Sequence, residues 1–187
     1  MQRPLAVDAD GLDLLLGKFL RRYAYISLTN IESLSEQFAR FIRATEVPRD
    51  PFHLLPHLGI ALERKLLSPP SRAIWTRENN HYTIHYSASD RTASANFSLW
   101  HELFEMLAAH PQCPSALSPW LYERLANKFA SFMLMPREAV LTQAARLRRN
   151  PECLVPILSQ RFLVSQTAMR KRLYELRVQG SGSRSQP

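Results

Sequence analysis

Cysteine is scarce in this sequence, and the scarcity limits how the fold can be held together. Only Cys113 and Cys153 occur among the 187 residues. Two thiols are too few for a disulfide framework, and neither belongs to the C-x-x-C pairs of a structural zinc site. The sequence therefore predicts a reducing compartment and one compact domain, which a chain with 45% hydrophobic residues can stabilise by its own core.

Long apolar runs are also lacking. No segment approaches the roughly 20 residues that are needed to cross a bilayer. The N-terminal stretch is interrupted by Asp8, Asp10 and Asp13, which argues against a secretory signal. We therefore expect a cytoplasmic protein that does not enter a membrane.

Positive charge, in contrast, is plentiful and unevenly spread. The formal net charge is +8. A basic patch attracts nucleic acid or an acidic protein partner, although a solvated helix face in a basic protein explains it equally well. The basic residues of the last quarter include Arg146, Arg148, Arg149, Arg161, Arg170, Lys171, Arg172, Arg177 and Arg184.

Helical periodicity dominates the first third of the chain. Apolar residues recur at helical spacing through residues 12–23 and 31–42, and Asn30 is a candidate cap for the second helix. A third, short helix is predicted from Pro51 to His57. We assign residues 1–50 to an N-terminal helical segment, whose apolar stripes either pack on the core or form a partner surface.

The middle of the chain predicts a small sheet. GIALERKLL is typical of a strand, and RAIWTRENNHYTIHYS predicts a hairpin that turns at residues 78–80. In the second arm His81 and His85 share one face, because side chains alternate along a strand. They are candidate contacts to a substrate or an oxyanion, and the alternative is that both lie on the solvent face of the hairpin.

From Ala95 helical patterns continue almost to the end. Pro111 ends the first of these helices, and Ser118 caps the next one, which has a proline in its first turn. Ser165 is the predicted cap of the last helix.

These patterns predict the domain organisation and the fold class. We place a core at residues 51–140, a C-terminal helical region at residues 141–178 and a disordered tail at residues 179–187. The predicted fold class is α+β: mainly helical, with a small sheet or hairpin packed against the helix that contains His101.

That helix contains the stretch FSLWHELFEML, whose polar residues are candidates for a metal site. His101 and Glu105 are separated by about 40° of helical rotation, so both can reach one metal ion. Glu102 can act as a general base on a water held by that ion. By itself this His-Glu-x-x-Glu pattern is a weak indication of a metal site, because Glu105 is equally explained as a solvated charge.

A second helix strengthens the metal hypothesis. ERLANKFASFMLMP places Ala126 and Ala130 on the same side as Glu123. Small residues let two helices approach closely, so Glu123 can be carried towards the helix that contains His101.

Three segments together resemble the ImmA/IrrE metallopeptidases. FSLWHELFE matches the zinc-protease helix of that family, ERLANKFASFMLMP matches its Glu-x-x-Ala-Asn-x-Phe-Ala helix, and RFLVSQTAMRKRLYEL matches its closing helix. The resemblance covers roughly residues 50–178. It implies a zincin-like fold in which the sheet lies beside the metal-site helix.

The resemblance also implies roles for individual residues. It makes His101 and Glu123 metal ligands and Glu102 the general base. The family's second histidine falls on Glu105, and this is a departure from the pattern. A carboxylate binds zinc at a distance similar to that of imidazole, but the harder, more anionic set makes manganese or iron a competitor.

Three functions follow as hypotheses. The resemblance implies a metal-dependent endopeptidase, with zinc as the expected ion, that cleaves a helix-turn-helix transcriptional repressor and so switches on phage, mobile-element or stress genes. Alternatively, Glu105 marks lost catalysis, and the fold survives as a protein-binding module. A third hypothesis is DNA binding through the basic C-terminal helices, where Ser165 precedes Arg170, Lys171 and Arg172.

Overall fold

The computed structural model describes residues 9–89, 92–114, 117–147 and 151–178. The predicted tail at residues 179–187 lies outside these ranges. Over the described residues the chain is mainly helical with one small sheet, which confirms the predicted α+β class. In chain order the elements are α1 (Ala9–Leu20), α2 (Ile31–Phe41), α3 (Pro51–His57), β1 (Ile60–Lys65), β2 (Ala73–Glu78), β3 (His81–Ser87), α4 (Thr92–Ala109), α5 (Pro119–Leu134), α6 (Arg137–Arg146), η1 (Pro151–Cys153), α7 (Leu154–Arg161) and α8 (Gln166–Glu175).

The sheet has three strands in the order β1-β3-β2. β3 pairs in parallel with β1 and antiparallel with β2, which leaves β2 at one edge. The β2–β3 hairpin turns through Asn79 and Asn80, whose φ angles are 47° and 65°. A tight hairpin turn with positive φ at both central positions favours asparagine, so the predicted turn has a local chemical cause.

One face of the sheet packs against the helices. Tyr82 and Ile84 of β3 are buried, and Tyr86 packs edge-on against Phe52 of α3 with 5.3 Å between ring centroids. The alternation predicted for this strand is therefore present, with the tyrosine and isoleucine face turned inward.

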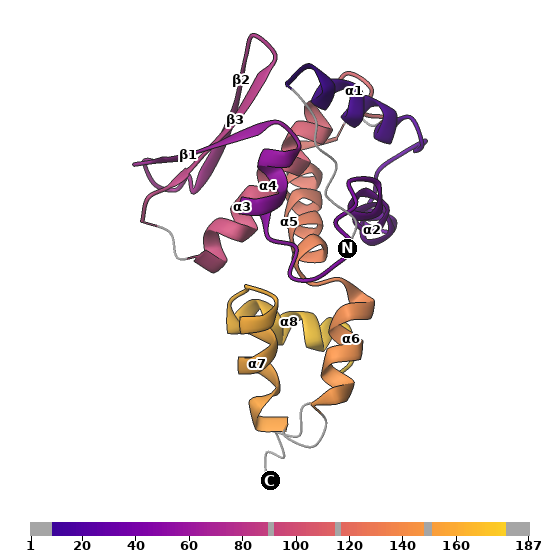
Figure 1. The fold of residues 1–187 in the computed structure, drawn as a ribbon. Helices are drawn as coiled ribbons and strands as arrows, with labels where there is room; N and C mark the ends of the chain where they lie inside the picture. Colours follow the sequence, from indigo (N-terminus) through magenta and orange to yellow (C-terminus); the bar gives the residue numbers. More distant parts are fainter. Residues whose placement is uncertain (1–8, 90–91, 115–116, 148–150, 179–187) are drawn as a thin grey trace.

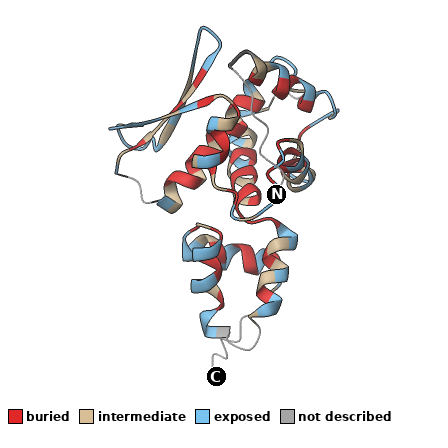
Figure 2. Ribbon diagram, viewed as in Figure 1, coloured by how far each residue is buried: buried red, intermediate tan, exposed pale blue. Residues whose placement is uncertain are grey.

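The core is built around α4 and α5. Phe104 of α4 lies 5.4 Å from Phe129 of α5 between ring centroids, and Phe129 lies 5.7 Å from Phe38 of α2. Buried residues line the facing sides of these helices (Figure 2). Phe19 of α1 is fully buried against Phe38, so the apolar stripes of the N-terminal helices pack on the core.

Two of the three helix caps that the sequence predicts are present in the structure. The hydroxyl oxygens of Ser118 and Ser165 accept hydrogen bonds from the backbone N–H groups of Leu121 and Ala168 at 3.4 and 3.1 Å. Asn30 precedes α2 but does not cap it with its side chain. Its Oδ1 accepts a hydrogen bond from the backbone N–H of Ser27 instead, which closes the preceding turn.

The last three helices lie together at the end of the molecule away from the sheet (Figure 1). α7 and α8 pack against each other, and Leu158, Phe162 and Met169 are fully buried between them and their neighbours. No helix among the described residues is long and apolar enough to cross a membrane.

Candidate metal centre

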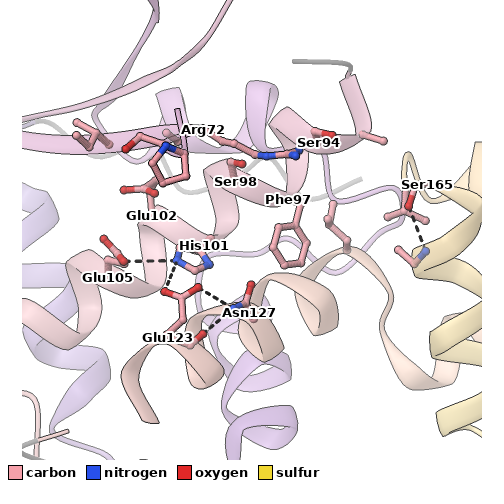
Figure 3. A pocket seen from close by; sticks show the side chains of 18 of the residues that line it. Arg72, Ser94, Phe97, Ser98, His101, Glu102, Glu105, Glu123, Asn127 and Ser165 are labelled. Carbon is pink, nitrogen blue, oxygen red and sulfur yellow. Dashed lines mark hydrogen bonds and ion pairs between the residues drawn. The ribbon is translucent and has the colours of Figure 1, made fainter. Parts of the chain in front are cut away.

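α4 and α5 bring His101, Glu105 and Glu123 together. The Nε2 atom of His101 lies 3.4 Å from Oε1 of Glu105 and 3.6 Å from Oε2 of Glu123 (Figure 3). The three ligand atoms all lie within 4.8 Å of one another. Within the described part of the chain, no other three His, Cys, Asp or Glu side chains converge in this way.

The spacing of these atoms fits a tetrahedral metal ion. Zinc bonds of about 2.0–2.2 Å to nitrogen and oxygen place neighbouring donor atoms roughly 3.3–3.6 Å apart. The two distances from His101, 3.4 and 3.6 Å, lie in that range. One imidazole and two carboxylates thus suit a divalent cation in their chemistry, and both carboxylates lie at a suitable distance from the imidazole.

Small residues on α5 allow this convergence. Ala126 and Ala130 are fully buried, and the longer Phe129 fills the space beside them against Phe104 of α4. Because neither alanine has a side chain beyond Cβ, α5 can lie close to α4. Glu123, one turn before Ala126, then reaches His101.

Asn127 fixes the orientation of Glu123. Its Nδ2 donates to the backbone carbonyl and to Oε1 of Glu123, both at 2.9 Å. The other carboxylate oxygen, Oε2, is the one that faces His101. Sequence reasoning missed this role, although the i, i+4 spacing of the two residues on one helix was visible.

Glu102 is the buried carboxylate of the site. It is 6% exposed and lines the same cavity as the three ligands. Burial, reinforced by the charge of Glu105, raises the pKa of Glu102 to about 7, although His101 and a hydrogen bond from the backbone of Trp75 oppose the shift. A carboxylate that titrates near neutrality is suited to accept and return a proton.

In His101, burial and the neighbouring carboxylates shift the pKa in opposite directions. Burial alone would lower the pKa of its imidazole, but the hydrogen bond to Glu105 and the charges of Glu123, Glu105 and Glu102 outweigh burial and raise that pKa. The surroundings of His101 therefore favour a positive charge, which a metal ion would supply.

A cavity of about 680 Å³ opens over these residues. One wall is the start of β2 with the preceding residues, including Arg72, and Figure 3 shows Arg72 across His101 from Glu123. Another wall is the N-terminal end of α8, which contributes Ser165. Sequence reasoning missed both walls, because nothing local links residues 72 and 165 to residue 101.

The structure does not bring His81 and His85 to this cavity. His81 is exposed, and Nδ1 of His85 lies 3.2 Å from Oε2 of Glu63 on β1. Both project from the face of β3 opposite to Tyr82 and Ile84. Neither is among the residues that line the cavity.

A protein-family model described as the IrrE N-terminal-like domain matches residues 58–174. The chain belongs to this family. As an IrrE-like domain it carries a peptidase fold of a family that is generally metal-dependent, and the His-Glu-Glu cluster lies within the matched residues.

Among solved structures, the IrrE-like domain is similar to one described as a Mycobacterium tuberculosis transcriptional regulator. The TM-score is 0.53 and the sequence identity 16%, over 87% of this chain and 51% of that chain. This chain thus spans about half the length of that regulator, and the likeness concerns the fold. Comparison with curated proteins gives no match.

Proposed function

We propose that this IrrE-like domain is a metal-dependent endopeptidase that cleaves a specific protein, with a helix-turn-helix transcriptional repressor as the target class. The observation that carries the proposal is the placement of an ionisable, buried Glu102 beside three converging ligand side chains. Ligands alone would fit a structural site, whereas a carboxylate with a pKa near 7 in the same cavity adds a proton acceptor.

Each residue has one task in this mechanism. His101, Glu105 and Glu123 hold the ion, which when bound supplies Lewis-acid polarisation and lowers the pKa of water. Glu102 takes the proton from the attacking water and returns it to the leaving amine. Asn127 keeps Oε2 of Glu123 directed towards His101.

The edge strand β2 offers unpaired backbone groups with which an extended substrate segment can form hydrogen bonds. The backbone carbonyl of Arg72 accepts from the N–H of Ser87, so the polar backbone groups of Ala73 and Trp75, one and three residues on, point away from β3. The backbone of Trp75 already bonds Glu102. Ala73 lines the cavity, where an extended substrate segment can pair with its free backbone edge.

The choice of a protein target rests on the family and on the outward backbone groups of Ala73, which lines the cavity at the edge of the sheet. A solved structure with a similar fold is described as a transcriptional regulator, which supports a role in gene regulation. The rival function is a binding module that has lost catalysis through Glu105. Both functions use the same cavity, so only a measurement of substrate cleavage distinguishes them.

The first experiment measures bound metal and cleavage together. Protein purified without chelators should contain about one equivalent of divalent metal by elemental analysis, and it should generate new peptide termini when incubated with a cell lysate. Glu102→Gln should keep the metal and abolish the new termini, because an amide cannot accept the proton. Cleavage retained by that variant rules out Glu102 as base, and metal without cleavage by the wild type favours the binding module.

A second experiment addresses the identity of the metal. We expect zinc to be held with little preference over manganese or iron, because two carboxylates make a hard ligand set. Glu105→His replaces one carboxylate by imidazole and should shift the preference towards zinc, measured as the ratio of dissociation constants for zinc and manganese. An unchanged ratio would show that Glu105 is not a ligand.

A further inference from the structure

We propose that the end of the cavity next to α8 is a subsite for one large apolar side chain of the substrate, and that Ala168 sets the size that this subsite accepts. Assigning the side chain to a substrate rests on the proposed function, whereas the subsite itself can be tested without cleavage. α8 then selects which sequence is cut, although it contributes no ligand to the metal centre.

The cavity is much larger than the metal centre needs. Its volume of about 680 Å³ lies within the roughly 300–1,000 Å³ of pockets that hold small ligands. A metal-bound water takes up only about 30 Å³. Most of the space is therefore left for parts of a substrate, and the walls around His101 determine which parts fit.

The wall on the α8 side is apolar and begins beside the metal centre. The ring of Phe97 lies 6.4 Å from that of His101 between centroids, on the side of His101 that faces Ser165 (Figure 3). Because Phe97 is one helical turn before His101, a side chain next to the scissile bond meets hydrocarbon directly beside this ligand. The other apolar residues of the wall come from the end of α5 and from the start of α8 with the turn before it: Leu134, Met135, Val164 and Ala168.

Charge is missing from this wall. The residues that line the cavity from the end of α5 and from the α8 region are all uncharged. The polar groups nearby already have partners, since the amide of Asn127 bonds Glu123 and the hydroxyl of Ser165 accepts from the N–H of Ala168. A charged side chain would lose water here without gaining a partner, whereas an apolar one is stabilised by leaving water.

Two hydrogen bonds hold the wall against the helices of the metal centre. Nδ2 of Asn96 on α4 donates to the carbonyl of Leu163, the neighbour of Val164, at 3.1 Å. Nε of Arg172 on α8 donates to the carbonyl of Met135 at 3.0 Å. A wall that is fixed to both α4 and α5 keeps one shape, so it can discriminate between side chains by size.

Ala168 is the residue on which the size limit depends. It is half-buried in the first turn of α8, and it is the smallest apolar side chain of the wall. A larger side chain at this position would extend into the space that the substrate otherwise fills. The wild type should therefore accept leucine, methionine or phenylalanine, and prefer each of them to glycine by at least tenfold.

The test follows the binding of N-acetylated amino acid amides to the full chain by NMR, with isotope-labelled methionine methyl groups. Met135 lines the subsite, whereas Met133 and Met169 are fully buried outside the cavity and serve as internal controls. N-acetyl-leucinamide should shift the Met135 signal and bind at least tenfold more tightly than N-acetyl-glycinamide. The corresponding glutamate amide should bind no better than the glycine compound.

Variants with opposite expected effects distinguish loss of the subsite from misfolding. Ala168→Phe should weaken binding of N-acetyl-leucinamide at least tenfold. The matched control Ala145→Phe, at an exposed position on α6 outside the cavity, should change it by less than twofold. Val164→Ala should instead enlarge the subsite and raise the affinity for N-acetyl-tryptophanamide at least threefold over the wild type.

Three outcomes would overturn the subsite. The first is a Met135 signal that responds to none of the compounds or equally to all of them, and the second is an equal loss in A145F and A168F. The third is preferred binding of the glutamate compound, which would assign this wall to an acidic side chain.

Cleavage is measured separately with a library of random peptides. The wild type should cut next to leucine, methionine or phenylalanine, and A168F should shift the preference to glycine, alanine or serine. An unchanged preference would show that Ala168 does not set the size limit. A library left uncut would count against the peptidase proposal, while the NMR titration would still decide the subsite.

Discussion

Glu102 shows a conflict between stability and chemistry at the scale of one residue. Its side chain is almost wholly buried beside two further carboxylates, and its ionised form is therefore costly in the metal-free protein. The backbone of Trp75 and the imidazole of His101 offset only part of this cost. Such a residue is disfavoured on stability grounds, which supports its assignment to catalysis.

This conflict predicts a pH-dependent effect of Glu102→Gln. The folded-state pKa of about 7 lies above the ordinary 4.5, so the cost is absent below pH 4.5, grows as the pH rises from 4.5 to about 7, and is constant above that. An amide is neutral throughout. Metal-free E102Q should be more stable than the wild type by about 2–3 kcal/mol at pH 8 and nearly equal to it at pH 4.5.

The measurement is urea unfolding of chelator-treated protein at the two pH values. An equal difference at both would mean that the substitution acts through packing and not through ionisation. Excess zinc at pH 8 should make the wild type more stable than E102Q. The bound ion compensates the negative charge of Glu102, and the variant has no such charge.

At the scale of elements, short-range patterns were the reliable ones. The predicted bounds of α3 and the Asn79-Asn80 hairpin turn agree with the structure, and so does the Ser118 cap, because each depends on neighbours within a few residues. The parallel pairing of β1 with β3 was not predicted. It joins Ile60 to Tyr82 across an intervening strand, and no local signal specifies such a contact.

In the candidate site, too, features set by nearby residues were predictable and features set by tertiary packing were not. The positions of His101 and Glu105 relative to each other follow from one turn of helix, and small residues on α5 predicted the approach of Glu123. The cavity walls at Arg72 and Ser165 come from tertiary packing alone. For His85 the period of two gave the shared face but not which face meets the helices.

At the scale of the whole molecule, Arg172 joins its two ends. Its side chain is buried on α8, and its Nε donates to the carbonyl of Met135 at 3.0 Å at the end of α5. One Nη bonds Glu32 on α2, and the guanidinium stacks 4.6 Å from the ring of Phe132. A single cation thus ties the C-terminal helices to the N-terminal ones and holds α8 as a wall of the cavity.

Replacing Arg172 should therefore affect both stability and the cavity. Arg172→Met keeps the apolar length but leaves the Met135 carbonyl and Glu32 without a partner, which should cost about 3–5 kcal/mol in urea unfolding. Arg170→Met, on the exposed face of the same helix, should change stability by less than about 0.5 kcal/mol. Limited proteolysis should cut the first variant, but not the second, between α6 and α8. Equal resistance of the two variants would mean that the apolar core of α7 and α8 holds this region in place without the ion pair.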